Sequence, residues 1–308
     1  MSSLTRQIRL ILHAGTSKTG TSSLQFHMDR NRQTLKDAGI LYPSEGTKEF
    51  RVPKHQWLVG VLQSANQSEM RRRLDRINAE VAPTTHTILL STEGIFNHWW
   101  DFPDDGKELL RQVAQAFDTS VWIWFRDPVT FFASYYLQAL RTPKISAIPA
   151  YGRDHGVRDL LRMPWITRHL QYQALLAEFG RICGEDSVYP FAHAKDLVAE
   201  VYDLFGIARP DVSAPRENVT SLASAGVEIL RIVNRYLLDV SEKERAYELV
   251  EQLNTLIGHR DQPFTMSPDD EEYVRSLGDC TRETLDAMDR RSHERWAARF
   301  PSGHDAGE

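Results

Sequence analysis

The residue types between positions 15 and 23 are those that bind phosphate groups in proteins. Gly15 and Gly20 lie five positions apart and allow the main chain to curl, so that successive N–H groups point at one anion. Lys18 lies between the two glycines and adds a positive charge. Hydroxyl groups lie on both sides of this lysine, at Thr16, Ser17, Thr19, Thr21, Ser22 and Ser23. The segment therefore predicts a phosphate-binding loop.

The loop departs from the Walker A sequence G-x-x-x-x-G-K-[ST] in the position of its lysine. Thr21 follows Gly20 here, and Lys18 lies inside the loop. This arrangement keeps the anion-binding curl but lacks the lysine that contacts the β- and γ-phosphates, which argues against ordinary ATP or GTP hydrolysis. The alternative is a turn that only caps a helix, with Thr21 or Ser22 as the capping residue.

A second basic group follows an apolar run farther along the chain. Residues 121–125 predict a strand, Arg126 follows it directly, and Ser134 lies within the helix predicted for residues 128–141. Ligands of open α/β sheets bind outside the carboxyl ends of the strands, so we expect Arg126 to share a crevice with the phosphate loop. The Arg126 guanidinium and the Ser134 hydroxyl can then hold one phosphate, and two anion sites indicate a ligand with separated phosphates. The alternatives are a salt bridge between Arg126 and Asp127 and a packing role for Ser134.

These residues must be positioned by strands and helices that the apolar pattern predicts. Residues 8–14, 87–91, 121–125 and 187–191 predict strands, with a short extended piece at 39–43. Their apolarity is continuous, which favours central parallel strands covered on both faces. Helices are predicted at 22–38, 54–82, 106–117, 128–141, 168–180 and 194–205.

The chain after Gly206 has a different pattern. Residues 222–238, 241–256 and 269–296 predict amphipathic helices without a strand, and we expect a helical layer or lid packed on the sheet. No linker-like composition interrupts the chain. We therefore predict an α/β fold as one domain over residues 1–308, with an α/β core at 8–206 and a helical C-terminal part at 207–300.

Two of these motifs resemble those of sulfotransferases that use 3′-phosphoadenosine 5′-phosphosulfate (PAPS). The segment from Gly15 to Gln25 is similar to their 5′-phosphosulfate loop, and the segment from Arg126 to Ser134 to their 3′-phosphate motif. Residues 39–43, Gly-Ile-Leu-Tyr-Pro, resemble a feature of bacterial members. The resemblance covers roughly residues 8 to 140. It implies a P-loop-like three-layer α/β/α fold with a central parallel sheet, PAPS as the sulfonate donor, adenosine 3′,5′-bisphosphate (PAP) as the product, and no metal.

The resemblance also has a gap. The R-K-G-x-x-G-D-W-K type of segment found near the C-terminus of eukaryotic cytosolic members is absent, and residues 215–221 with Arg216 are the candidate replacement.

Sulfonyl transfer requires a base for the acceptor and positive groups for the leaving phosphate. Lys18, within the loop, is the candidate on the leaving-group side. Glu93 is the candidate base because it follows the predicted strand 87–91, a position where the resembled family often carries Glu or His. His55 is the second candidate, since a neutral imidazole has a suitable pKa. Each has an ordinary alternative, namely a helix cap or ion pair for Glu93 and a core or surface position for His55.

The acceptor is a hydroxyl or an amine, and the sequence leaves its class open among small molecules, carbohydrates, lipids and peptides. The aromatic residues between Phe96 and Phe102 could form a wall of the acceptor pocket or simply belong to the core, and residues 142–164 could form an acceptor loop. Two other functions are possible with this pattern: a P-loop kinase or NTPase that transfers phosphoryl groups, and a non-catalytic nucleotide-binding protein.

The composition limits the partners of the protein. A formal charge of -5 and a pI near 6.1 give no basic field for nucleic acid or an anionic membrane, so anion recognition must be local. Cys183 and Cys280 lack metal-site spacing, and no run of apolar residues is long enough for a membrane span. We expect a cytoplasmic protein without integral membrane contact. The oligomeric state is left open.

Overall fold

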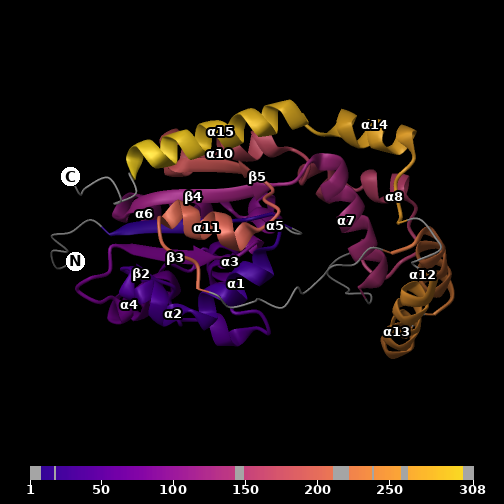
Figure 1. Ribbon diagram of the computed structural model, residues 1–308, viewed down its shortest axis with the longest axis horizontal. Helices are drawn as coiled ribbons and strands as arrows, with labels where there is room; N and C mark the ends of the chain where they lie inside the picture. The colour runs from indigo at the N-terminus through magenta and orange to yellow at the C-terminus, as the bar shows by residue number, and fades with distance from the viewer. Residues whose placement is uncertain are drawn as a thin grey trace. The chain divides into compact units, whose positions relative to one another are not determined.

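A five-stranded parallel sheet forms the centre of the structure, a computed structural model that describes residues 8–16, 19–142, 149–210, 222–237, 239–257 and 263–300. The strands lie in the order β2-β3-β1-β4-β5 (Figure 1). They are β1 (Arg9–His13), β2 (Ile40–Leu41), β3 (Thr87–Ser91), β4 (Asp118–Phe125) and β5 (Val188–Ala192). All pairs are parallel, which confirms the predicted α/β class and central parallel sheet.

One face of the sheet is covered by α1 (Thr21–Arg30), α2 (Arg32–Asp37), α11 (Leu197–Phe205) and α15 (Arg282–Arg299). Their apolar side chains form one buried cluster with alternate residues of the strands. Trp122 lies at its centre, with the ring of Trp124 at 5.8 Å and that of Trp296 at 4.7 Å, both nearly perpendicular to it. The face carrying α11 is seen in Figure 1.

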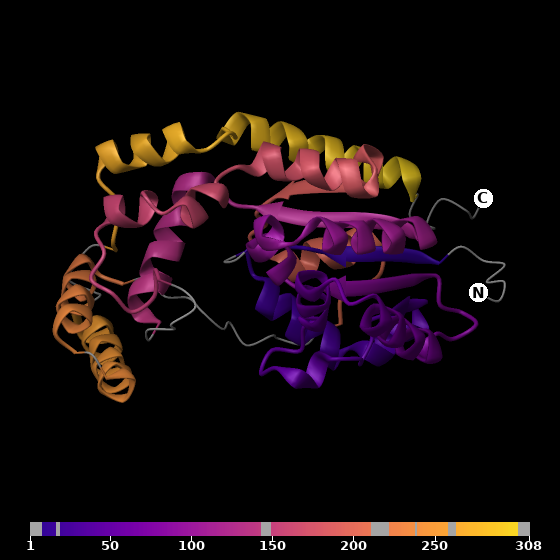
Figure 2. The ribbon, with the colours of Figure 1, turned by 180° about the vertical axis from the view of Figure 1, so that it is seen from behind.

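The opposite face is covered by five helices: α3 (Trp57–Ser64), α4 (Gln67–Glu80), α5 (Gly94–His98), α6 (Asp104–Ala116) and α10 (Tyr172–Cys183). Figure 2 shows the molecule from this side. Leu74 and Ile77 of α4 line a small apolar pocket with residues of β1 and β3. Phe125 of β4 stacks on Tyr172 of α10, and Trp99 packs on Phe179. Both faces are therefore packed mainly with apolar side chains.

Three of the predicted helices are each divided in two. The helix expected at 22–38 breaks at Asn31, whose side-chain amide donates to the His27 carbonyl. The helix expected at 54–82 breaks at Ala65, which has a φ of 49°, and Asn66 then caps α4 by accepting from the Glu69 N–H. The helix expected at 269–296 is α14 (Pro268–Leu277) followed by α15. The side chains of Asn31 and Asn66 make hydrogen bonds to the main chain at the first two breaks, which apolar periodicity does not detect.

The chain divides into two compact units. The sheet unit contains Met1–Asp127, Tyr172–Glu217 and Arg282–Glu308, and the helical unit contains Pro128–Gln171 and Asn218–Thr281. The helical unit is made of α7 (Pro128–Arg141), α8 (Val157–Leu161), α9 (Pro164–Arg168), α12 (Ser224–Tyr236), α13 (Val240–Ile257) and α14. Of the helices described after Gly206, α15 alone belongs to the sheet unit, whereas we had expected all of them to pack on the sheet.

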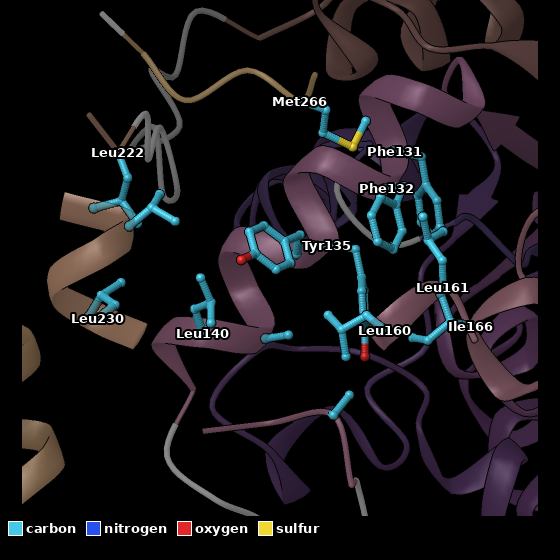
Figure 3. Packing of buried hydrophobic residues seen from close by; sticks show 14 of the residues in the cluster. Phe131, Phe132, Tyr135, Leu140, Leu160, Leu161, Ile166, Leu222, Leu230 and Met266 are labelled. Carbon is cyan, nitrogen blue, oxygen red and sulfur yellow. The ribbon is translucent and has the colours of Figure 1, made fainter. Parts of the chain in front are cut away.

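The helical unit has a core of its own (Figure 3). Phe132 and Tyr135 of α7 lie in this core with Leu160 of α8 and Leu230 of α12, all of them buried. Asn234 of α12 is also buried. Its side-chain amide donates to the Leu140 carbonyl at 2.8 Å and its carbonyl accepts from the Tyr247 hydroxyl at 2.5 Å. This amide joins α7, α12 and α13.

Among the helices that the structure describes, none combines the length and the apolarity required to cross a bilayer.

Replacing Asn234 tests its role in the helical unit. We expect Asn234→Leu to lower the free energy of unfolding by about 2 kcal/mol or more, because the Leu140 carbonyl and the Tyr247 hydroxyl would remain buried without their partner. Gln252→Leu is the matched control, since Gln252 is exposed on α13. Scanning calorimetry measures both. Equal thermal stability of the two variants would contradict the assigned role.

Candidate functional site

The carboxyl edge of the sheet brings the predicted functional segments together. β1 lies between β3 and β4, and the pairing continues past its end: the Thr92 N–H donates to the His13 carbonyl and the Ala14 N–H to the Trp122 carbonyl, both at 3.0 Å. The chain leads from β1 to β2 on one side of the sheet and from β4 to β5 on the other. Adjacent strands whose connections diverge form a crevice at their carboxyl ends, the usual ligand site of open α/β sheets.

The loop after β1 is fastened to β4. Thr16 is fully buried and its hydroxyl donates to the Trp124 carbonyl at 2.8 Å, while the Thr19 hydroxyl donates to the Thr16 carbonyl at 2.7 Å. Gly20 has a φ of 93°, a conformation that side chains rarely adopt. These contacts fix Thr16 and Thr19, the described residues on either side of positions 17 and 18. Ser17 and Lys18 lie outside the described residues.

Helix α1 begins directly after this loop. Gly20 is the N-cap residue and no described side chain caps the helix, so the alternative in which Thr21 or Ser22 is the capping residue is wrong. Thr21 is buried, with its hydroxyl 3.3 Å from that of Thr19, and Ser22 and Ser23 are half-buried in the first turn. Uncapped N–H groups at a helix start favour an anion, because they are unpaired donors at the positive end of the helix dipole.

A buried histidine packs against the start of the loop. His13 is fully buried, its Nδ1 is 2.8 Å from the Ser91 hydroxyl, and its Nε2 has no hydrogen-bond partner among the described residues. A Cβ on Gly15 would lie 2.5 Å from this Nε2, so a side chain at position 15 would collide with the imidazole. Burial lowers the pKa of His13 to about 4, although the charge of Glu93 opposes this. The ring is therefore neutral at neutral pH.

Glu93 follows β3 and lies at the same edge. Its Oε1 accepts from the Lys54 ammonium at 2.9 Å, and its Oε2 is 3.4 Å from the side-chain amide of Gln25, which also donates to the Ser91 hydroxyl at 3.0 Å. Burial alone would raise the pKa of Glu93. The Lys54 ammonium and the hydrogen bonds from Lys54 and Gln25 outweigh burial and lower this pKa, so the carboxylate is ionised at neutral pH.

His55, the second candidate base, has both ring nitrogens bonded to the main chain. Its Nδ1 accepts from the Ser91 N–H at 3.0 Å, and its Nε2, which must then carry the proton, donates to the Pro43 carbonyl at 3.1 Å. The side chain is fully buried, and burial lowers its pKa to about 4 against the effect of the Pro43 hydrogen bond. Through these contacts, His55 fastens the segment before α3 to β3.

Arg126 follows β4 and contacts a residue that the sequence did not single out. Its Nη2 is 3.0 Å from Nε2 of His193, the residue that follows β5. Nε of Arg126 is buried and has no hydrogen-bond partner in the described part of the chain. Burial and the charge of Arg126 lower the pKa of His193 to about 4, although the nearby main chain of Thr19 acts to raise it. The Arg126–His193 pair thus lies near the loop after β1.

The remaining predicted residues lie elsewhere. Ser134 is part of α7 in the helical unit, so the site is built here from the sheet unit alone. Arg216 lies outside the described residues, as do residues 143–148 of the expected acceptor loop. Phe96, Trp99 and Phe102 of the aromatic segment are buried in the core of the sheet unit, which favours the packing alternative for them.

Three polar residues of the site make contacts that the sequence did not predict. Lys54 precedes His55 and Gln25 ends the quoted loop motif, but their contacts depend on the fold. His193 carried one usable signal, since it is a polar residue directly after a predicted strand, as Arg126 is.

No protein-family model matches the chain, and a search of curated proteins found no match. The assignment of function therefore depends on the chemistry of this edge.

The buried histidines predict a loss of stability in acid. His13 and His55 have pKa values of about 4 in the folded protein and 6.5 ordinarily, so the unfolded chain binds protons first as the pH falls. Each histidine contributes stability that is complete above about pH 6.5 and decreases by about 1.4 kcal/mol per pH unit towards about pH 4.

Urea unfolding as a function of pH measures this loss. His55→Gln cannot be protonated, so we expect a shallower decrease of stability with acidification, together with lower stability at neutral pH. His98→Gln, at a partly exposed side chain on α5, controls for the removal of one histidine. A decrease as steep in His55→Gln as in the wild type would contradict this prediction.

Proposed function

We propose that the protein is a sulfotransferase that moves a sulfonate group from PAPS to a hydroxyl or amine acceptor and releases PAP. The observation that carries the proposal is the hydrogen bond between Arg126 and His193, whose ring lies near the main chain of Thr19. It brings a guanidinium at the end of β4 close to the loop after β1, so one edge offers two places for anions. A donor with phosphates at its 3′ and 5′ positions needs two such places.

The residues at this edge fit such a donor. The Arg126 guanidinium has donors besides the one bonded to His193, and the first turn of α1 offers N–H groups that no described side chain caps. In the proposal, the hydroxyls of Thr21, Ser22 and Ser23 and these N–H groups hold the 5′-phosphosulfate, and Arg126 holds the 3′-phosphate. Lys18 keeps the role implied by the resemblance, on the leaving phosphate.

PAPS, when bound, supplies the sulfonate group and a phosphate leaving group. Glu93 is the proposed base, because its carboxylate is ionised and each oxygen retains a lone pair beside its present hydrogen bond. It would accept the proton of the acceptor hydroxyl or amine. Lys54 holds this carboxylate in place and keeps it charged. His55 is less suited to this role, since neither ring nitrogen is available.

A kinase or NTPase is the competing proposal for this fold. It requires an acidic residue for magnesium, and Glu93 would be the candidate. The Lys54 ammonium lies 2.9 Å from this carboxylate and would repel a divalent cation. The absence of lysine after Gly20 points in the same direction. Both features favour the sulfonate donor.

Removing the Arg126 charge should weaken PAP binding. We expect Arg126→Ala to lose on the order of 2 kcal/mol of binding free energy, because a phosphate would lose a charged hydrogen-bonding partner. Calorimetric titration with PAP measures this. Arg72→Ala, at an exposed arginine of α4, is the control. Tighter binding of ATP with magnesium than of PAP, unchanged in Arg126→Ala, would favour the kinase or NTPase.

Removing the Glu93 charge should abolish turnover but leave PAP bound. We expect Glu93→Gln to reduce the release of PAP from PAPS by about two orders of magnitude or more in the presence of a panel of phenols, alcohols and amines. Glu108→Gln, on the exposed surface of α6, is the control. Lys54→Met should raise the pKa of Glu93 and shift the acid limb of the activity profile to higher pH. Full activity of Glu93→Gln would remove Glu93 from the mechanism.

A further inference from the structure

The contacts of His193 define which of its nitrogens carries the proton. An arginine side chain is only a donor, so Nε2 of His193 must accept from Nη2 of Arg126, at 3.0 Å. A neutral imidazole then carries its proton on Nδ1. Burial and the Arg126 charge lower the pKa of His193 to about 4, against a raising effect of the Thr19 main chain, so the imidazole is neutral at neutral pH.

We propose that His193 is a positioning residue of the nucleotide site, which orients the Arg126 guanidinium beside the loop after β1 before a ligand binds. This inference rests on the function proposed above. His193 acts through Arg126 and needs no contact with the ligand.

The main chain fixes where the imidazole lies. The His193 N–H donates to the Phe125 carbonyl at 2.8 Å, which continues the pairing of β4 and β5 by one residue. Asp289 of α15 accepts from the neighbouring Ala192 N–H at 2.8 Å. The residues after β4 and after β5 are thereby held side by side, so the ring meets the guanidinium directly.

Fixing a guanidinium in advance improves anion binding. A free arginine side chain loses rotamer freedom when it binds a ligand, and a hydrogen bond already made to Nη2 removes part of that cost. The bond to His193 uses Nη2, so the guanidinium keeps other donors for a ligand.

A double-mutant cycle with PAP as the probe tests this role. We expect His193→Ala to weaken PAP binding about tenfold in the wild-type background and by less than about twofold in the Arg126→Ala background, because residues that act through one another are not additive. His193→Gln should retain binding within about threefold, since the amide oxygen can accept from Arg126. Calorimetry gives the dissociation constants, and thermal unfolding verifies that each variant is folded.

His86→Ala is the matched control. His86 is an exposed histidine before β3, at the opposite edge of the sheet, and its ring also makes hydrogen bonds, to the Ala38 carbonyl and the Thr87 hydroxyl. We expect its PAP affinity to equal that of the wild type.

The outcomes separate this inference from the proposed function. If the wild type binds no PAP, the proposed function fails. If it binds PAP and Arg126→Ala weakens binding, but His193→Ala has no effect, the inference alone is wrong. Equal losses for His193→Ala in both backgrounds would also overturn it, because His193 would then act on the ligand independently of Arg126.

Discussion

The hydrogen-bonded register of three strands is the constraint on which the site depends. Because β1 pairs with β3 and β4 in parallel, the residues that follow these strands are delivered to the same edge. The pairing of β4 with β5 extends this edge to His193. Both faces of the sheet are packed with apolar side chains, so the polar groups have no other place. A slip in any of these pairs would separate the loop, Glu93 and Arg126.

Much of the sheet and part of the site could be predicted from the sequence. Continuous apolar runs correctly located the strands, because a strand buried on both faces needs such residues. The helix breaks at Asn31 and Ala65 were not predictable, since periodicity does not report a side chain that competes with the main chain. Nor did the sequence reveal that α12, α13 and α14 share a core with α7, because amphipathic faces do not identify their partners. Glu93 was recognisable by its place after β3, whereas the contact of Arg126 with His193 depends on the lateral order of the strands.

The site handles charge in two different ways. Glu93 is paired with an ammonium, so this part of the edge is electrically balanced. Arg126 is held by a neutral imidazole, so its positive charge is not cancelled and remains available to an anion. An acidic chain with a formal charge of -5 can thus present a local cation without a basic surface. The Lys54–Glu93 and Arg126–His193 hydrogen bonds thus have similar lengths, but the first neutralises a charge and the second does not.

The position of α15 in the sheet unit has a consequence for biosynthesis. This helix supplies Trp296 to the cluster around Trp122, although the two tryptophans lie far apart along the chain. During translation, β1 to β5 leave the ribosome long before residues 282–299, and until then the aromatic face beside β5 lacks its cover. Exposed apolar surface of this kind favours aggregation and is what chaperones bind. Packing of the sheet unit is therefore incomplete until residues 282–299 have been added, and strand pairing alone does not finish it.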